Sequence, residues 1–113
     1  MTDMKAIQQC CGPVLVEPID ATEAEQLAAG FKMLADPVRL RILSLIANSA
    51  DQQLCACDLP ALLGRSQPTV SHHLGLLTQA GLLTREQRGK WAWFRVEPEK
   101  VGILRKALEI KTG

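Results

Sequence analysis

Apolar residues in this chain recur at helical spacing only after its first 19 positions. Residues 1–19 have no periodicity and contain Pro13 and Pro18, so we expect a flexible, irregular arm there. The run Asp20-Ala21-Thr22-Glu23 resembles a capping box and predicts the start of a first helix. The apolar positions of that helix form one narrow stripe: Ala24, Leu27, Phe31 and Leu34. The pattern divides the chain into an arm, residues 1–19, and a domain, residues 20–113.

Two further helices follow, and both have clear end signals. Asp36-Pro37 ends the first helix and opens the second, because aspartate caps a helix well and proline is tolerated in its first turn. Residues 38–46 are apolar around much of the helix, so this should be the most buried one. After a polar loop, a third helix is predicted within residues 54–64, with Asp58 as its cap and Gly64 as its stop.

A tight link, Arg65-Ser66, joins the third helix to a fourth that begins at Gln67-Pro68. Two short helices joined by such a turn form a helix-turn-helix. The inward positions of the fourth helix are apolar: Val70, Leu74 and Leu77. Its outward positions hold polar side chains without bulk: Gln67, Thr69, Ser71 and His72. We therefore expect this helix to pack on one side and to contact DNA bases with the other.

The apolar period changes to two after Gly81, which is typical of strands. Residues 83–85 and 91–96 flank a basic tip whose turn lies near Arg88-Gly89. Pro98 then opens a last helix. The apolar stripe of this helix consists of Val101, Leu104, Ala107 and Leu108. The expected fold class is mainly α with a β-hairpin wing, a winged helix-turn-helix.

The apolar stripes of the first and last helices are more than a three-helix core and a hairpin can cover. Pairing of these two helices across a two-fold axis would bury both stripes, which favours a homodimer. It would also place two DNA-reading helices about one DNA turn apart, roughly 34 Å. The alternative is that both helices fold back on their own core.

Length and charge refine this picture. A chain of 113 residues allows one domain, and an apolar share of 47% leaves a surplus for a partner subunit. The formal net charge of +1 does not by itself indicate nucleic acid. The distribution does, because residues 65–95 hold five arginines and lysines against one acid, Glu86.

The polar residues of this basic region fit the chemistry of DNA. Glutamine can bind adenine through two hydrogen bonds, and hydroxyl groups can bind a base or a phosphate. The predicted contacts to double-stranded DNA are Arg65, Ser66, Gln67, Thr69, Ser71, His72, Arg88 and Lys90. His73 and the two tryptophans, Trp91 and Trp93, are expected to pack instead. The alternative is an ordinary capped surface helix with polar residues.

The cysteines occur in two close pairs, Cys10-Cys11 and Cys55-Ala56-Cys57. The chain has no run of about 18 apolar residues and no signal-peptide pattern, so we expect no membrane and a reducing, cytoplasmic location. Thiols paired so closely in that compartment indicate metal ligands or redox groups. The alternative for Cys57 is packing as a small apolar residue. A thiol enzyme is not expected, because the chain has no glycine-rich loop to hold a phosphate-like substrate.

Thiolates select soft or borderline ions, such as arsenite, antimonite, cadmium, lead, cuprous copper or zinc. Cys55 and Cys57 supply two ligands at most, whereas arsenite bonds three thiolates and cadmium or zinc takes four ligands. The missing ligands should come from Cys10 or Cys11, with the other subunit's arm as the expected source. Because a three-coordinate ion needs only one of two adjacent cysteines, we favour As(III) or Sb(III) as the bound ion. Cd(II) or Pb(II), and thiol oxidation, are the alternatives.

Three stretches together resemble the ArsR/SmtB family of metal- and metalloid-responsive repressors: residues 36–43, 54–59 and 66–74. The resemblance covers about residues 22–110. It implies a winged-helix homodimer, paired through its first and last helices, that sits on its own operator and leaves when an inducer binds.

The chain departs from this family's patterns at the metal sites. Arsenic-responsive members with all ligands in one helix resemble Leu-Cys-Val-Cys-Asp-Leu-Cys, and the third cysteine falls at Pro60 here. Other members of the arsenic branch resemble the Cys10-Cys11 arm, and the cadmium/lead branch also combines an arm with a Cys-x-Cys helix. The last helix has no histidine, so the zinc site of other relatives cannot be assembled there.

Overall fold

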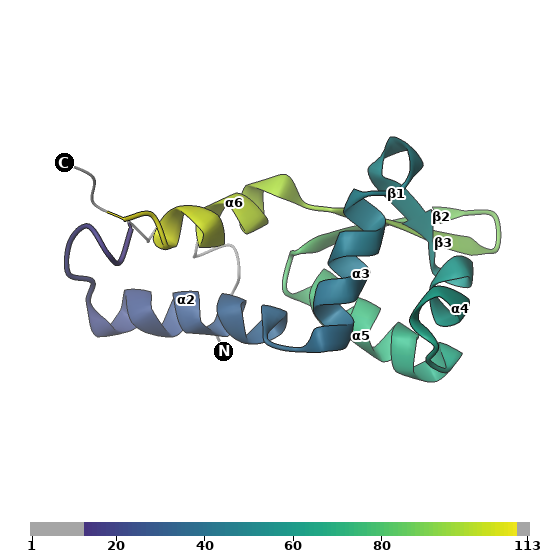
Figure 1. Ribbon diagram of the computed structural model, residues 1–113, viewed down its shortest axis with the longest axis horizontal. Coiled ribbons are helices and arrows are strands. Elements are labelled where there is room, and N and C mark those ends of the chain that lie inside the picture. Colours follow the sequence, from purple (N-terminus) through teal and green to yellow (C-terminus); the bar gives the residue numbers. More distant parts are fainter. Residues whose placement is uncertain (1–12, 111–113) are drawn as a thin grey trace.

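The computed structural model describes residues 13–110. Its helices and strands, in chain order, are α2 (Ala21–Leu34), α3 (Pro37–Ala47), β1 (Gln53–Cys55), α4 (Leu59–Leu63), α5 (Gln67–Gln79), β2 (Leu83–Arg88), β3 (Trp91–Val96) and α6 (Pro98–Ala107). Two short 3₁₀ turns flank β1, at Ala50–Gln52 and Ala56–Asp58. The helices α2 and α6 lie alongside one another at one end of the molecule, and the other elements form the opposite end (Figure 1). This is the winged helix-turn-helix that the sequence predicts.

The predicted starts of α2 and α3 are confirmed at atomic detail. The Asp20 carboxylate accepts the backbone N–H of Glu23 at 2.8 Å. The Asp36 carboxylate accepts the N–H groups of Val38 and Arg39, at 2.8 Å and 3.1 Å. The bond from Arg39 is the main reason that the pKa of Asp36 lies below its ordinary value. Both aspartates therefore satisfy amide groups that a helix leaves open at its start.

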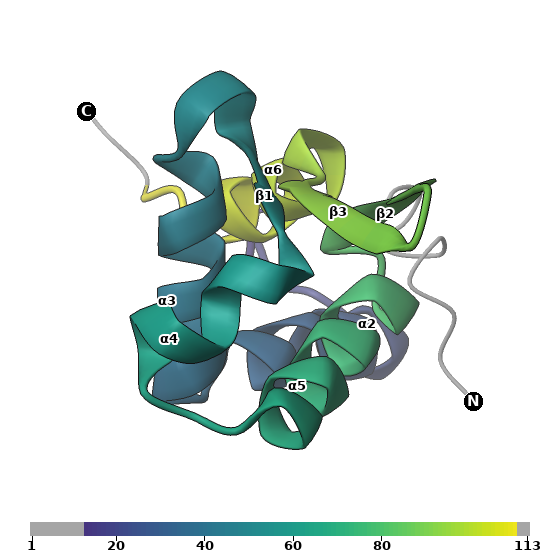
Figure 2. The ribbon, with the colours of Figure 1, turned by 90° about the vertical axis from the view of Figure 1, so that its right-hand side faces the viewer.

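The sheet has one strand more than the sequence predicts. Its order is β1-β3-β2, with both neighbouring pairs antiparallel, so β1 adds to the expected hairpin. In this register, Gln53 lies opposite Arg95, and Cys55 lies opposite Trp93. Figure 2 shows β1 alongside β3, on the side of β3 that faces away from β2.

The third predicted helix is correspondingly shorter than expected. Helix α4 begins only at Leu59, because residues 53–55 pair with β3 and residues 56–58 form a 3₁₀ turn. Asp58 stands at the N-cap position of this helix as expected, but its side chain makes no capping hydrogen bond. The predicted stop at Gly64 is confirmed: its φ of 64° is a left-handed conformation in which glycine is favoured.

The core lies mainly at the end formed by α3, α4, α5 and the sheet. Its fully buried side chains include Ile42, Ile46, Leu59, Leu77 and Leu82. At the other end, α2 contributes the buried Leu27 and α6 contributes Leu104 and Ala107. The stripes of α2 and α6 are thus only partly covered within one chain.

The described part of the predicted arm, residues 13–19, contains no helix or strand. It is nevertheless attached to the domain, because the N–H of Val14 donates to the carbonyl of Ala107 at 2.9 Å. Val14 and Ile19 also pack against the core. Residues 1–12 lie outside the described range. Among the described residues, no helix is long and apolar enough to cross a membrane.

Candidate DNA interface and thiol site

Helix α5 is positioned by a polar start and an apolar inner face. The Ser66 hydroxyl accepts the N–H of Thr69 at 3.4 Å and donates to the Thr69 hydroxyl at 2.9 Å. Pro68 occupies the first turn, where a missing N–H costs nothing. The buried residues of this helix are Val70, Leu74 and Leu77, as the sequence predicts. Their packing fixes which side of α5 remains in contact with solvent.

Six predicted DNA contacts lie together at the turn before α5 and along its first two turns. Arg65, Ser66, Gln67, Ser71 and His72 are exposed, and Thr69 is half-buried. The start of α5 lies toward the end of the molecule opposite α2 and α6, and the helix runs back beneath α3 (Figure 1). The exposed face therefore offers amide, hydroxyl, imidazole and guanidinium groups, which can bind base edges and phosphates.

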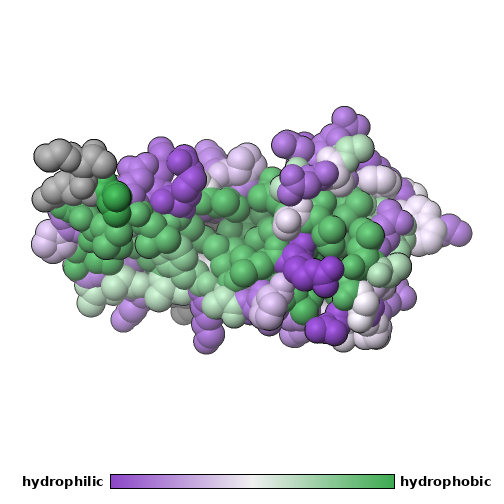
Figure 3. Space-filling view, in the orientation of Figure 1, coloured by the Kyte–Doolittle hydropathy of each residue, from purple (hydrophilic) through white to green (hydrophobic). Residues whose placement is uncertain are grey.

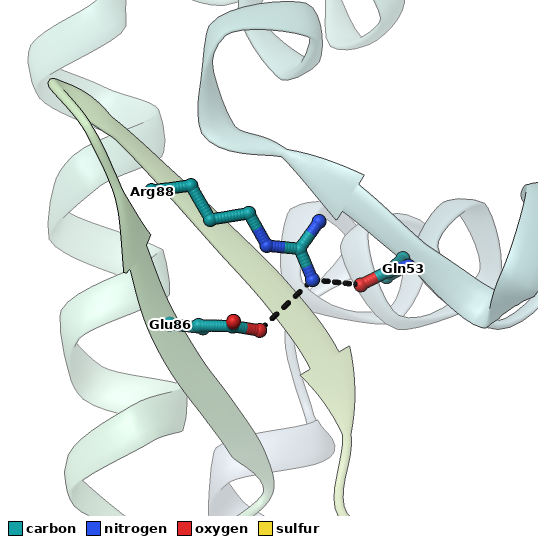
Figure 4. A network of polar contacts seen from close by, with 3 residues as sticks. All are labelled: Gln53, Glu86 and Arg88. Atoms are coloured by element: carbon teal, nitrogen blue, oxygen red, sulfur yellow. Dashed lines mark hydrogen bonds and ion pairs between the residues drawn. The ribbon is translucent and has the colours of Figure 1, made fainter.

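The other two predicted DNA contacts, Lys90 and Arg88, lie on the wing and differ in whether they are free to reach DNA. Lys90 is exposed at the two-residue turn between β2 and β3. Arg88 instead turns back onto the sheet, where its Nη2 donates to Gln53 at 2.5 Å and to Glu86 at 2.8 Å (Figure 4). Its guanidinium also lies over the Trp93 ring, 4.7 Å from the ring centre.

This cluster changes the charge properties of the wing. The hydrogen bond and ion pair with Arg88 lower the pKa of Glu86, and the same contact raises the pKa of Arg88. To bind a phosphate, Arg88 would have to leave these partners. The pairing could have been found from sequence, because residues 86 and 88 lie on the same face of a strand.

The two tryptophans differ. Trp93 is half-buried beneath Arg88, as expected of a packing residue. The expectation that Trp91 packs is wrong, because 51% of its surface is exposed, with the Lys90 ammonium 5.8 Å from its ring centre. Trp91 lies at the first position of β3, beside the hairpin turn, where few neighbours are available to cover it.

Cys55 and Cys57 bring their sulfur atoms to one point. Cys55 is 3% exposed at the end of β1, and Cys57 is exposed in the 3₁₀ turn that follows. The two are joined as a disulfide, with their Cα atoms 5.2 Å apart, and the N–H of Cys57 donates to the Cys55 sulfur at 3.3 Å. Sharing of one ligand by these two side chains stays a prediction, and it requires that the disulfide be reduced.

Further thiol ligands would have to come from elsewhere. Within residues 13–110, no group of three or more histidine, cysteine, aspartate or glutamate side chains is placed to hold a metal ion. Cys10 and Cys11, the other predicted ligands, lie outside the described residues. Cys55 and Cys57, bonded to each other, are thus the two cysteines that this part of the chain brings together.

A small cavity connects the thiol site with both parts of the candidate DNA interface. Its volume is about 230 Å³, and its lining includes Cys57, Gln67, Ser71, Lys90 and Trp91. Cys57, the start of α5 and the tip of the wing therefore border the same space. An occupant of this cavity would contact all three.

One positioning contact was not foreseen from sequence. The Arg39 side chain donates to the carbonyl of Met33 at 2.7 Å, and its guanidinium lies 3.3 Å from His73 Nδ1. It thus links the end of α2 and the start of α3 to the half-buried His73 on α5. The contact joins residues 34 positions apart, so no local pattern in the sequence indicates it.

Known proteins resemble this chain in both sequence and fold. Residues 36–85 match the model of the family described as bacterial regulatory protein, arsR family. The chain is 46% identical over 68 residues to the arsenical resistance operon repressor of Escherichia coli, which covers 60% of this chain and 56% of that protein. It is 34% identical over 94 residues to the arsenical resistance operon repressor of Bacillus subtilis. That match covers 80% of this chain and 88% of the Bacillus subtilis protein. The match thus spans little more than half of the Escherichia coli protein's length.

A solved structure supports the same relationship. The crystal structure of the AntR antimony-specific transcriptional repressor aligns with a TM-score of 0.67 at 31% identity, covering 79% of each chain. It shares the fold described above, and the family is one of regulators without enzymatic activity. The chain therefore belongs to the arsR family of helix-turn-helix transcriptional regulators.

Proposed function

We propose that this protein is a repressor that binds double-stranded operator DNA as a homodimer and is released when arsenite or antimonite binds its cysteine thiolates. The observation that carries this proposal is the convergence of Cys55 and Cys57 directly before α4. From there the chain reaches α5 through a helix of five residues and Gly64. Relatives named for arsenical resistance and for antimony support the choice of ion.

In this proposal, the exposed start of α5 enters the major groove. Gln67, Ser71 and His72 contact base edges. Ser66 and Thr69 hold the start of the helix and present their hydroxyl groups to the DNA phosphates. Arg65, Lys90 and Arg88 bind phosphates or the minor groove, with Arg88 exchanging its contacts to Glu86 and Gln53 for the DNA. These contacts would make binding strongly salt-dependent.

The homodimer is supported by the uncovered apolar surface at the α2 and α6 end. Apolar residues gather over this end in Figure 3 and extend toward α3. Leu108, at the end of α6, and Leu15 are more than half exposed. Burying such a surface against a second copy is favourable, and a two-fold axis through it would give the two copies of α5 a fixed spacing.

Inducer binding is proposed to change that spacing. Arsenite takes three thiolates, so Cys55 and Cys57 require a third sulfur, which Cys10 or Cys11 of the other subunit would supply. Reduced thiols are available for this in the cytoplasm. Closing the site would tilt α4 and, through Gly64, α5. Inducer and DNA would then oppose each other reciprocally, with a coupling of about 1–3 kcal/mol.

The test is a fluorescence anisotropy titration of fully reduced protein on its operator. We expect arsenite and antimonite to release the DNA at lower concentration than cadmium or lead. The Cys55→Ser protein should bind DNA normally and lose the response. The Cys10→Ser/Cys11→Ser protein tests the arm. An unchanged response to arsenite would show that neither arm cysteine is needed as the third ligand. Wild-type protein that keeps its operator with every one of these ions would refute the proposal.

A second candidate is supported by the pairing of Cys55 with Cys57 within one chain. Oxidation would remove two protons and two electrons from the two thiols, delivered to an oxidant such as a peroxide, and join the sulfurs in a disulfide. In that case, DNA release would follow peroxide and be reversed by dithiothreitol. Arsenite added without oxygen would have no effect, whereas the main proposal requires release under those conditions.

A further inference from the structure

We propose that strand β1 transmits the state of the Cys55–Cys57 site to the wing, through the contact between Gln53 and Arg88. This route rests on the function proposed above and adds to the one through α4 and α5. Figure 4 shows the Arg88 side chain reaching from the end of β2 across β3 to Gln53 on β1. The wing arginine is thus held by the strand that ends at Cys55.

The register of the sheet places these groups on one face. Cys55 on β1 and Glu86 on β2 are both paired with Trp93, one from each side of β3. Directly paired residues of antiparallel strands point to the same face, as do residues two positions apart in one strand. Gln53, two positions before Cys55, and Arg88, two positions after Glu86, therefore share that face. The sheet joins the thiol site to the wing arginine without passing through α5.

Arg88 has contacts with all three strands on this face. Its Nη2 donates to Gln53 on β1 at 2.5 Å and to Glu86 on β2 at 2.8 Å. Its guanidinium lies 4.7 Å from the ring centre of Trp93 on β3. The Arg88 side chain is 36% exposed, so most of it is covered. A DNA phosphate competes with these contacts for the same guanidinium.

Strand β1 depends on contacts with its neighbours for its position. It has three residues and lies at the edge of the sheet, paired with β3. Asp51 and Gln52, directly before it, both have a φ of 56°, a left-handed conformation that residues other than glycine rarely adopt. The Ser49 hydroxyl, which donates to the Gln53 carbonyl at 2.6 Å, and the pairing with β3 hold the strand against this strain. A change at one end of so short a strand is therefore felt at the other end.

The inducer and the DNA compete through this strand. An ion at Cys55 and Cys57 orders the end of β1, and an ordered β1 keeps Gln53 against Arg88. When Arg88 moves to a phosphate, β1 loses its contact with the wing arginine. A ligand shifts an equilibrium only by its differential affinity for the two states, which here differ in whether Arg88 is held by β1. The ion favours the state in which Arg88 is held, and DNA favours the other.

The first test needs no DNA. The arginine Nε–H signals of the reduced full-length protein are followed by NMR as arsenite is added, and calorimetry measures the binding. We expect the Arg88 signal to shift in proportion to bound arsenite, and the signal of Arg85, on the opposite face of β2, to stay unchanged. In the Gln53→Met protein, the arsenite affinity should change less than about threefold, while the Arg88 signal no longer follows the ion.

Two results of this test would be decisive against the route. An Arg88 signal that does not change while arsenite binds would overturn it. If the wild type binds no arsenite, the function proposed above fails by itself, and the reduced and disulfide-bonded proteins are compared instead. Identical Arg88 signals in these two forms would overturn the route as well, whereas different signals that become identical in Gln53→Met would support it.

The second test measures the operator affinity of the reduced protein without an ion. Gln53→Met keeps the length of the side chain and removes its acceptor oxygen, so it should raise the affinity about twofold to fivefold by freeing Arg88. Gln53→Glu gives Arg88 a charged acceptor, which binds it more strongly, and should lower the affinity about threefold to tenfold. The matched controls are Gln87→Met and Gln87→Glu, on the opposite face of β2, and each should change the affinity less than its Gln53 counterpart.

A double-mutant cycle separates this contact from a general effect on the wing. With Arg88→Met in place, Gln53→Met and Gln53→Glu should differ in operator affinity no more than the two Gln87 variants do. Arsenite should weaken operator binding of Gln53→Met at least about threefold less than that of the wild type. Equal operator affinities of the two Gln53 variants, or a wild-type response to arsenite in Gln53→Met, would overturn the proposal.

Discussion

The two ends of this molecule differ in how completely they bury their apolar residues. At the end formed by α3, α4, α5 and the sheet, large side chains such as Ile42, Ile46 and Leu59 are fully buried within one chain. At the end formed by α2 and α6, Leu108 is 54% exposed, and Leu15 is exposed as well. The first end contains most of the fully buried side chains, although Leu40 and Leu62 are about half exposed there. The second end has fewer buried side chains and apolar surface still to cover.

This difference indicates a division of roles. The closed end, formed by α3, α4, α5 and the sheet, packs α5 and the wing against a buried core, which fixes the position of a surface for reading DNA. The open end leaves apolar area that a second copy can bury. Three substitutions test this division. The first measures stability at the closed end, the second measures self-association at the open end formed by α2 and α6, and the third tests the contact that links the two ends.

The largest effect is expected from removing a side chain at the centre of the closed end. Leu59 is fully buried in α4, so Leu59→Ala leaves a cavity and should lower the free energy of unfolding by about 2–5 kcal/mol. Urea denaturation followed by circular dichroism measures this. Leu62→Ala, in the same helix but 49% exposed, is the control and should change stability by less than about 1 kcal/mol. Equal effects of the two would mean that α4 is not part of the core.

A smaller effect on folding, but a clear one on assembly, is expected at the open end. Leu108→Glu places a charge on the proposed pairing surface and should weaken self-association at least about tenfold. Sedimentation equilibrium over a range of protein concentrations measures it. Leu62→Glu introduces the same charge at a similarly exposed leucine of the opposite end and should leave association unchanged. A wild-type protein that stays monomeric at micromolar concentration would contradict the comparison.

The smallest effect is expected at the junction. Arg39→Met removes the contacts to the Met33 carbonyl and to His73, and should cost about 1–2 kcal/mol of stability. Arg41→Met provides the control, because Arg41 makes longer bonds, of 3.2 Å and 3.4 Å, to carbonyls of α4. If Arg39 also orients α5, its variant should bind operator less tightly at a temperature where both proteins are folded.

Most of the fold could be predicted from local patterns. The caps at Asp20 and Asp36 and the stop at Gly64 are short-range signals, and each is found where the sequence places it. The alternation of residues 91–96 likewise predicts β3. Such features depend only on residues that are close in the sequence, so they can be predicted from one sequence without the structure.

The parts that could not be predicted depend on contacts between distant residues. Strand β1 has three residues, too few to show a period of two, and it exists because it pairs with β3 about 40 positions later. The link from Arg39 to His73 is long-range in the same way. At the site, exposed residues of α5 follow from helical spacing, but the engagement of Arg88 with Gln53 depends on the unforeseen strand.

The pairing of β1 with β3 also gives the protein its own optical reporter. Cys55 lies directly opposite Trp93 in this ladder, so a heavy atom bound at the sulfur would sit close to an indole ring. Heavy atoms quench indole emission, and the chain contains just two tryptophans. With Trp91 replaced by phenylalanine, the remaining emission would follow the arrival of an ion at Cys55 in real time, without any attached dye.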